Sequence, residues 1–455
     1  MRSSAPFGST ARQLLGHTWP VLVAQLLSMS MMVADTTIAA HYGTTDLAAV
    51  AVGNGLYVSV LMLLVGILQS VAPTVAHLVG GGRHTEIGAT LQQGFWLALL
   101  LAVPGTLILV FPQMLLELAR VPPDTGEKVS TYLRATAAGL PAILLYRTFY
   151  AFNNAVGRPR ALMAISLIAS SIHVPLAWAL TNGHLGIDAL GATGCGVSTS
   201  VVAWISLCCG ISYLSRNPAY RTYLIFHNWR GPRAASLFAL LRLGLPMGMS
   251  TFIEITSFTL IALFVARLGA EAVAGHRIVA NLAALVYMLP LSLSTATLVL
   301  VGQAAGAHDW QRARTVVRVG LLLSTCLATL VGILLWFARE PLMALSTDDV
   351  VVRAIAIALL PYICLYQLFD AAQTVASHAL RGYKVTLLPM ALHTLCFWGV
   401  GLGCGYWLSF HAGERSGAPS VAGFWEGGVL ATILASILFG GLLRLIAGRE
   451  SLNRA

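Results

Sequence analysis

Three acidic residues, Asp35, Glu254 and Asp370, lie inside long stretches of sequence that are otherwise almost entirely apolar. If such stretches cross a lipid bilayer, each charge costs about 2.5–3.5 kcal/mol on insertion scales, so it usually faces a bundle interior or a water-filled cavity. A carboxyl group in a medium of low dielectric can bind and release a proton near neutral pH. Glu254 and Asp370 could instead share Na⁺, because a hard cation favours oxygen ligands. We therefore expect the three acids to couple the protein to H⁺ or Na⁺.

Polar neighbours accompany each acid at helical spacing. Residues three or four positions apart share one face of a helix. The three polar stripes are Gln25, Ser28 and Asp35; Ser250, Glu254 and Ser257; and Tyr362, Tyr366, Asp370, Gln373 and Ser377. An acidic cavity with aromatic walls suits a lipophilic cation through Coulomb and cation–π attraction. We predict that these neighbours of the acids bind the cation or the substrate: Gln25, Ser250, Ser257, Tyr362, Tyr366 and Gln373.

A structural role is the alternative for each of these charged or titratable residues. Each acid could pair with an arginine for packing, and the candidates in neighbouring stretches are Arg134, Arg147 and Arg277. His173 is either a hydrogen-bonded core histidine or a possible proton relay. The internal repeat described below does not superimpose Asp35 on Glu254, so duplication of one structural acid does not explain them. This mismatch favours the coupling role for the acids.

The composition defines the class of protein that must position these residues. Of 455 residues, 57% are hydrophobic and 10% are charged, whereas soluble proteins carry about 25% charged residues. Several apolar stretches reach the roughly 20 residues that a transmembrane helix needs. The sequence therefore predicts an all-α polytopic membrane protein. Its twelve predicted spans are 14–40, 47–78, 91–111, 129–153, 160–182, 190–214, 236–265, 274–305, 316–338, 350–377, 384–409 and 421–447.

The charged residues of the connecting loops predict the orientation of these spans. Arginines gather in alternate loops, while the loops between them hold mostly Asp and Glu. Because the basic side of a membrane protein is cytoplasmic, both termini are expected inside the cell. One long polar connector, 217–235, divides the chain. We predict an amino-terminal lobe at 1–216, this cytoplasmic connector, and a carboxy-terminal lobe at 236–455, each lobe with six spans.

The two halves look like copies of one unit. A single constant offset aligns Pro20 with Pro246 and Gly43 with Gly269 without a gap, and a shifted offset aligns Tyr146 with Tyr366. Six spans are an even number, so both copies have the same orientation and form a parallel repeat. Two pseudo-symmetric lobes of this kind are typical of a transporter that works by alternating access.

Six segments in order resemble the multidrug and toxic compound extrusion (MATE) transporters, in particular their NorM-like bacterial branch. The segments are VADTTIAAHYG after Trp19-Pro20, VAPTVAHLVGGG from Val71, GATGCGVSTS from Gly191, FIEITSF from Phe252, VGQAAGA from Val301 and YQLFDAAQTVASHALRG from Tyr366. The resemblance implies export of organic cations in exchange for Na⁺ or H⁺. It matches Asp35 to an acid tied to protonation in the amino-terminal lobe, and Glu254 and Asp370 to the cation-site acids of the other lobe. His173 stands where related proteins often carry asparagine.

Two other functions, a flippase and an enzyme, would need different residues in the membrane. A flippase of a lipid-linked or other amphiphilic substrate in the same superfamily is the alternative, but it needs basic groups for pyrophosphate, and the deep charges here are mainly acids. An enzyme would need a nucleophile or a metal constellation, and no GxxxxGKS, HExxH or GxSxG motif is present. We expect no cofactor beyond the coupling ion and no nucleic-acid partner. The expected protein is a functional monomer in a bacterial inner membrane that takes cationic or amphiphilic small molecules.

Overall fold

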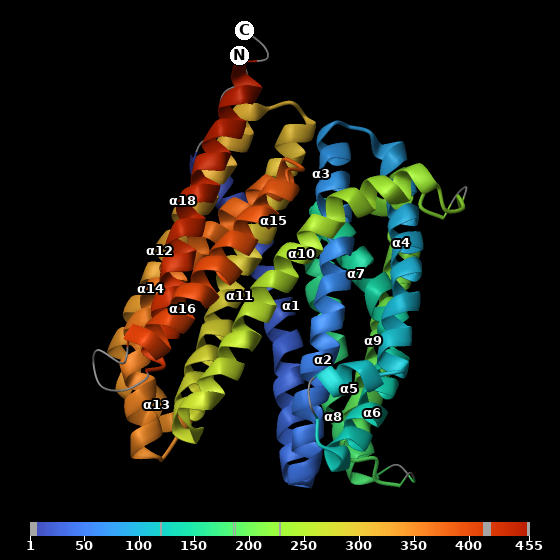
Figure 1. Cartoon of the computed structure of the whole chain (residues 1–455). Helices are drawn as coiled ribbons and strands as arrows, with labels where there is room; N and C mark the ends of the chain where they lie inside the picture. The colour runs from blue at the N-terminus through green and yellow to red at the C-terminus, as the bar shows by residue number, and fades with distance from the viewer. Residues whose placement is uncertain are drawn as a thin grey trace. The chain divides into compact units, whose positions relative to one another are not determined.

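The computed structural model describes residues 7–118, 121–184, 186, 188–226, 229–412 and 420–452. All regular structure in these residues is helical (Figure 1). The helices of the first half are α1 (Phe7–Tyr42), α2 (Thr44–Leu68), α3 (Val71–Gly80), α4 (His84–Val110), α5 (Gln113–Leu118), α6 (Pro123–Ala137), α7 (Leu140–Ala155), α8 (Pro159–Asn182), α9 (Ala192–Arg216) and η1 (Pro218–Tyr223). Those of the second half are α10 (Ala234–Val265), η2 (Ala266–Leu268), α11 (Ala270–Gly306), α12 (Trp310–Phe337), α13 (Arg339–Ser346), α14 (Val350–Gly382), α15 (Leu387–His393), η3 (Thr394–Leu402), α16 (Gly403–Trp407), η4 (Leu408–Ala412) and α18 (Ala422–Leu452).

Eleven stretches of the described residues are long and apolar enough to cross a membrane. The exception among the predicted spans is 129–153, which is built from two consecutive helices, α6 and α7. Pro141 lies in the first turn of α7, and a proline removes one backbone donor and disfavours helix in the residue before it. The all-α polytopic fold is therefore confirmed, with its fourth span interrupted next to Pro141.

Contacts divide the chain into two compact units. The amino-terminal unit is Pro20–Gly248, and the carboxy-terminal unit combines Met1–Trp19 with Met249–Ala455. The borders thus fall inside α1 and α10, close to Pro20 and Pro246. The predicted amino-terminal lobe instead begins at residue 1 and ends at 216, before the connector 217–235, so the two divisions differ for 1–19 and for 217–248.

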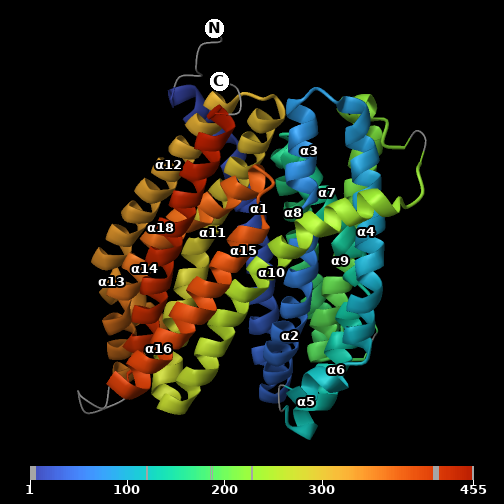
Figure 2. The ribbon, with the colours of Figure 1, turned by 45° about the horizontal axis from the view of Figure 1, so that its top comes forward.

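Long helices pack lengthwise in the carboxy-terminal unit. Helices α12, α14 and α18 lie side by side in both views (Figures 1 and 2), and α14 also packs along α11. Their core contains Leu293, Val319 and Phe439, each with no exposed surface. Burial of side chains of this size contributes about 1.5–3 kcal/mol each in water, and in lipid the same contacts act through close packing. This packing fixes the faces of α11 and α14 that carry polar residues.

The predicted connector is held against α4 within the amino-terminal unit. The Gln92 side chain donates to the Ile225 carbonyl at 2.7 Å, and the Gln93 side chain donates to the Gly231 carbonyl at 2.9 Å and accepts from the Arg233 amide at 2.8 Å. Trp229 stacks on Phe95, with ring centroids 6.5 Å apart. These bonds explain why the connector belongs to the amino-terminal unit rather than forming a free linker.

Asp46 joins three helices of the amino-terminal unit. It lies in the first turn of α2 and is 5% exposed. One carboxylate oxygen accepts from Lys128 of α6 at 2.6 Å, and the other accepts from the backbone amide of Ala192, the first residue of α9, at 2.8 Å. Gly191 allows this approach, because its φ of 54° is left-handed and an added Cβ would clash with the carboxylate. Asp46 is therefore a structural acid.

The Asp46→Ala variant tests this structural role. The substitution leaves the Ala192 amide and the Lys128 ammonium without their charged acceptor, which should cost about 1.5–3 kcal/mol. We expect the apparent melting temperature of the purified protein in detergent to fall by several degrees. Asp188→Ala, at an exposed acid, is the matched control and should leave the melting temperature unchanged. Equal melting temperatures for Asp46→Ala and the wild type would contradict the assignment.

Candidate functional sites

Asp35, His173 and Ser198 form a buried hydrogen-bonded chain across α1, α8 and α9. The Asp35 carboxylate lies 2.8 Å from His173 Nε2, and the Ser198 hydroxyl lies 3.2 Å from His173 Nδ1. The exposed fractions are 7% for Asp35 and 1% for His173. The structure therefore brings together the predicted acid and the predicted histidine, and it adds Ser198, which sequence reasoning missed.

The geometry of this chain suits transfer of a proton. Ser198 Oγ also lies 3.1 Å from the His173 backbone carbonyl. A doubly protonated imidazole is fully satisfied here: Nε2–H donates to Asp35, Nδ1–H donates to Ser198, and Ser198 donates to the carbonyl. When the ring loses a proton, the Ser198 hydroxyl can rotate and donate to the bare Nδ1. Both protonation states are thus accommodated without movement of the helices.

Glu254 and Asp370 belong to a second network, which lies within the carboxy-terminal unit. Tyr287 of α11 donates to Glu254 Oε1 at 3.1 Å, and Gln373 Nε2 donates to Asp370 Oδ1 at 2.9 Å. The two carboxyl groups interact electrostatically with each other. Asp370 is 1% exposed. The structure therefore places the predicted pair close enough to interact, and the hydrogen-bond donors of the pair are neutral side chains.

Further polar groups extend this second network. Gln373 Nε2 is also 3.1 Å from Thr374 Oγ1, and His393 Nε2 is 3.2 Å from Gln373 Oε1. Because Oε1 only accepts, His393 must carry its proton on Nε2. Carboxylate, phenol, hydroxyl and amide oxygens are the ligand atoms that a hard cation prefers. In the described part of the chain no three His, Cys, Asp or Glu side chains converge as a metal site.

Arg381 supplies the positive charge nearest to this network. It is 5% exposed, interacts electrostatically with Glu254, and approaches His378 Nε2 at 3.5 Å. Helical spacing in the sequence could have indicated this position, because Arg381 follows Ser377 by four residues and so shares a helix face with Asp370 and Gln373. Tyr287 and His393 carried no such signal, because they lie on other helices.

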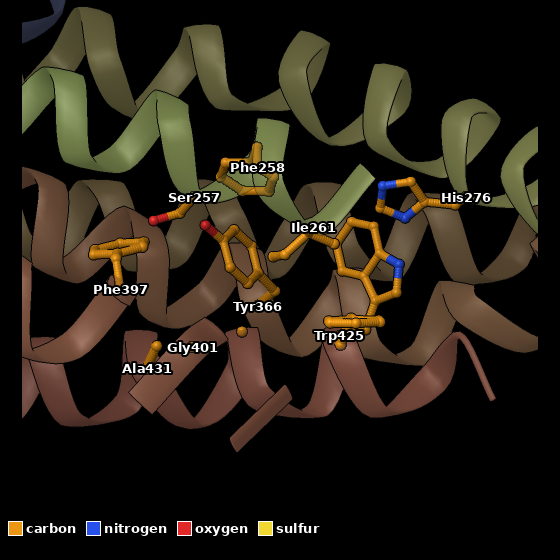
Figure 3. Close-up of a pocket in the computed structure, with 11 residues that line it drawn as sticks. Ser257, Phe258, Ile261, His276, Tyr366, Phe397, Gly401, Trp425 and Ala431 are labelled. Carbon is orange, nitrogen blue, oxygen red and sulfur yellow. The ribbon is translucent and has the colours of Figure 1, made fainter. Parts of the chain in front are cut away.

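Tyr366 lines a small aromatic cavity one helical turn from Asp370 (Figure 3). Its ring is 4% exposed and meets Phe258 and Trp425 edge to face, with centroid distances of 5.9 and 6.1 Å. In Figure 3 the Tyr366 hydroxyl points toward Ser257, while Phe397 and Gly401 close another side. The last two belong to η3, a π-helical segment, and π-helical turns are frequent at functional sites. The cavity volume, about 20 Å³, holds little more than one water.

Some of the predicted neighbours of the acids contact other groups. Tyr362 donates to Glu426 of α18 at 2.9 Å, an intramembrane acid that the sequence analysis did not single out. Ser257 donates to the Ile253 carbonyl of its own helix at 2.8 Å. Ser250 is buried one turn before Glu254, and Gln25 lies beside Tyr150. Gln373 reaches Asp370 on the same helix, but helical spacing alone does not decide which neighbouring helix each side chain contacts.

None of the three arginines expected as packing partners forms an ion pair with Asp35, Glu254 or Asp370 in the part of the chain that the structure describes. Asp35 pairs with His173, while Arg134 donates to the Val110 carbonyl at 3.2 Å and Arg277 is exposed. Arg147 faces a separate pocket with Tyr146. The three arginines proposed as packing partners therefore leave Asp35, Glu254 and Asp370 to other groups.

The fold and the two networks define an all-helical membrane protein built from two related halves, each with buried carboxyl chemistry. The chain belongs to the MatE family: the family model matches residues 20–179 and again 246–407. The two matches begin at Pro20 and Pro246, the pair of prolines that the predicted repeat aligns.

Individual proteins resemble the chain over almost its whole length. It is 64% identical over 448 residues, covering 98% of this chain and 97% of the relative, to the "Probable multidrug resistance protein NorM" of Aromatoleum aromaticum. It is 33% identical to the "Multidrug resistance protein PmpM" of Pseudomonas aeruginosa, covering 94% and 90% of the two chains. The fold matches a Vibrio cholerae MATE transporter, VcmN in its bent form, with a TM-score of 0.87, 17% identity and 98% and 99% coverage.

Removal of single phenol groups tests the second network. Tyr287→Phe deletes the donor to Glu254, and a hydrogen bond to a charged group contributes about 1.5–3 kcal/mol. On the antiport function proposed below, we expect at least a tenfold change in apparent affinity for the coupling ion in proteoliposomes. The affinity for H⁺ should rise, because the carboxylate loses a donor that stabilises its charge, whereas the affinity for Na⁺ should fall, because a phenol oxygen ligand is lost. Tyr362→Phe is the matched control, because it also removes a phenol donor to a glutamate, and it should keep wild-type affinity. Equal effects of the two variants would contradict the assignment of Glu254, and not Glu426, to the second network.

Proposed function

We propose that the protein is a secondary active antiporter that exports organic cations, drugs among them, in exchange for Na⁺ or H⁺ by alternating access. The observation that carries this proposal is the pair Glu254 and Asp370, two interacting carboxyl groups whose hydrogen-bond donors are neutral. Two neighbouring carboxylates repel each other. Arg381 interacts with Glu254, so Asp370 is the carboxylate left for a cation or a proton to neutralise. Binding of a small cation therefore competes with binding of a cationic substrate.

The energetics of the exchange agree with this proposal. One elementary charge that moves down a membrane potential of 100 mV releases about 2.3 kcal/mol. That energy drives a tenfold or larger concentration gradient of substrate, since a factor of ten corresponds to about 1.4 kcal/mol. Curated relatives named as multidrug resistance proteins support drugs as the substrate class.

The proposed setting is the bacterial inner membrane, with both termini cytoplasmic and the monomer as the functional unit. The arginine bias of alternate loops supports this orientation. A flippase of lipid-linked or amphiphilic substrates stays the alternative. Its pyrophosphate would need several basic groups, whereas the networks described above centre on Asp35, Glu254 and Asp370.

The Asp370→Asn variant tests the coupling role. An amide keeps the shape of the side chain but cannot exchange a proton or supply a negative charge, so ion-driven export should stop. We expect loss of drug resistance in an efflux-deficient host and loss of gradient-driven dye export from proteoliposomes, at normal expression. Asp349→Asn is the matched control on the same helix, because Asp349 caps α14 and asparagine caps equally well. Unchanged resistance in Asp370→Asn would contradict the proposal.

Release of bound dye then distinguishes the two ions. Addition of Na⁺ at fixed pH should release dye from a sodium-coupled protein, and only acidification should release it from a proton-coupled one. Either release should disappear in Asp370→Asn. A dye that neither ion displaces would argue against antiport altogether.

The His173→Asn variant tests whether the Asp35 network carries a proton. Asparagine keeps a donor for Asp35 but does not titrate, whereas an imidazole changes charge between about pH 5 and 8. We expect the dependence of export rate on pH to flatten across this range while export at its optimum persists. An unaltered pH profile would assign His173 to a packing role.

A further inference from the structure

A pocket within the amino-terminal unit, mostly apolar but lined by one arginine and several hydroxyl groups, is not used by either network. Its volume is about 90 Å³, several times the ~10–15 Å³ that one water requires. Helices α1, α7, α8 and α9 surround it. Its polar lining consists of Ser28, Tyr146, Arg147, Tyr150, Ser166, Thr199 and Ser206.

Arg147 is the unusual member of this lining. Its guanidinium stacks over the Tyr150 ring at 5.7 Å, and its Nε is buried without a hydrogen-bond partner. No ion pair among the described residues involves it; those present are Arg83–Glu86, Lys128–Asp46 and His173–Asp35. An arginine stays protonated in proteins, and an intramembrane charge without an acidic partner is costly and usually functional.

The internal repeat relates this pocket to the aromatic cavity of the other unit. Tyr146 lines the first and Tyr366 lines the second, and these tyrosines align in the repeat. The residue after each tyrosine differs, since Arg147 corresponds to Gln367. The same structural position thus carries a positive charge in one unit and a neutral amide in the other.

We propose that the Arg147 pocket binds the carboxylate of amphoteric substrates, which carry an acidic group as well as the cationic group. The guanidinium presents parallel N–H donors that match the two oxygens of a carboxylate. The Ser206 hydroxyl can donate to a further carboxylate lone pair, whereas Thr199 already donates to the Cys195 carbonyl at 3.0 Å. The phenol rings of Tyr146 and Tyr150 offer flat faces to an aromatic substrate body.

This inference rests on the proposed function and extends its substrate class. A transporter with acidic sites alone would accept cations and repel a substrate carboxylate. Arg147 neutralises that carboxylate at a point where desolvation would otherwise oppose its entry. The Arg147 guanidinium therefore anchors one functional group of the substrate.

Binding of a matched pair of dyes tests the proposal. One dye is a rhodamine with a free benzoate, which is amphoteric, and the other is its ethyl ester, a permanent cation. Fluorescence titration of the purified full chain gives both dissociation constants. In Arg147→Gln the affinity for the benzoate dye should fall about tenfold or more relative to the ester, as expected for one charged hydrogen-bonded contact.

Three further variants make the test specific. Arg147→Lys keeps the positive charge without the parallel N–H donors of the guanidinium, and it should restore part of the preference for the benzoate dye. Ser206→Ala should reduce that preference mildly. Arg134→Gln removes an exposed arginine of the same unit and should leave the ratio unchanged. A wild-type ratio in Arg147→Gln overturns the proposal. If Arg147→Gln binds neither dye, wild-type ratios in both Arg147→Lys and Ser206→Ala overturn it.

Two controls distinguish carboxylate binding at Arg147 from binding of an inorganic anion and from the antiport function itself. The ratio should not depend on chloride when isethionate replaces it at constant ionic strength; a ratio that follows chloride assigns the pocket to an inorganic anion and overturns the proposal. Gradient-driven export of the ester by the wild type tests the antiport function by itself. Failure of that export counts against the proposed function, whereas an unaltered binding ratio counts only against the Arg147 site.

Discussion

The need to satisfy every charge inside a lipid-facing helix bundle is the constraint on which the rest of this structure depends. Water cannot solvate a carboxyl group at such a depth, so each acid needs a partner from the protein. Asp35 obtains His173 from α8, Glu254 obtains Tyr287 from α11, and Asp370 obtains Gln373 from its own helix. The lengthwise packing of the long helices matters because it brings these partners within hydrogen-bonding distance.

Duplication supplied the same scaffold twice, but the two copies hold different chemistry. Ile261, which the repeat aligns with Asp35, lines the aromatic cavity, and Ser28, which the repeat aligns with Glu254, lines the Arg147 pocket. Asp35 and Glu254 therefore have neutral residues at the aligned positions of the other copy, and those neutral residues line cavities. One copy has a single acid in a hydrogen-bonded chain with histidine and serine. The other has two interacting acids whose hydrogen-bond donors are neutral, with Arg381 near Glu254.

The sequence predicted the helical fold well because its signals are local. Apolar runs of sufficient length, and the separation of arginines from acids in alternate loops, depend only on neighbouring residues. Details that depend on distant residues were not predictable. The bonds that hold the connector to α4 come from Gln92 and Gln93, which lie far from the connector in the sequence. The structural role of Asp46 likewise depends on Lys128 and on the start of α9.

The sequence by itself determined the class of protein and its internal repeat. It also singled out the three acids, because a charge inside an apolar stretch is costly wherever it lies. It also determined that Gln373 would lie near Asp370, since three residues separate them on one helix. Only the tertiary structure decided that Asp35 meets His173, that Tyr362 turns to Glu426, and that Arg147 faces a pocket without an acid. These outcomes depend on the rotation of each helix about its axis, which packing against other helices fixes and local sequence does not.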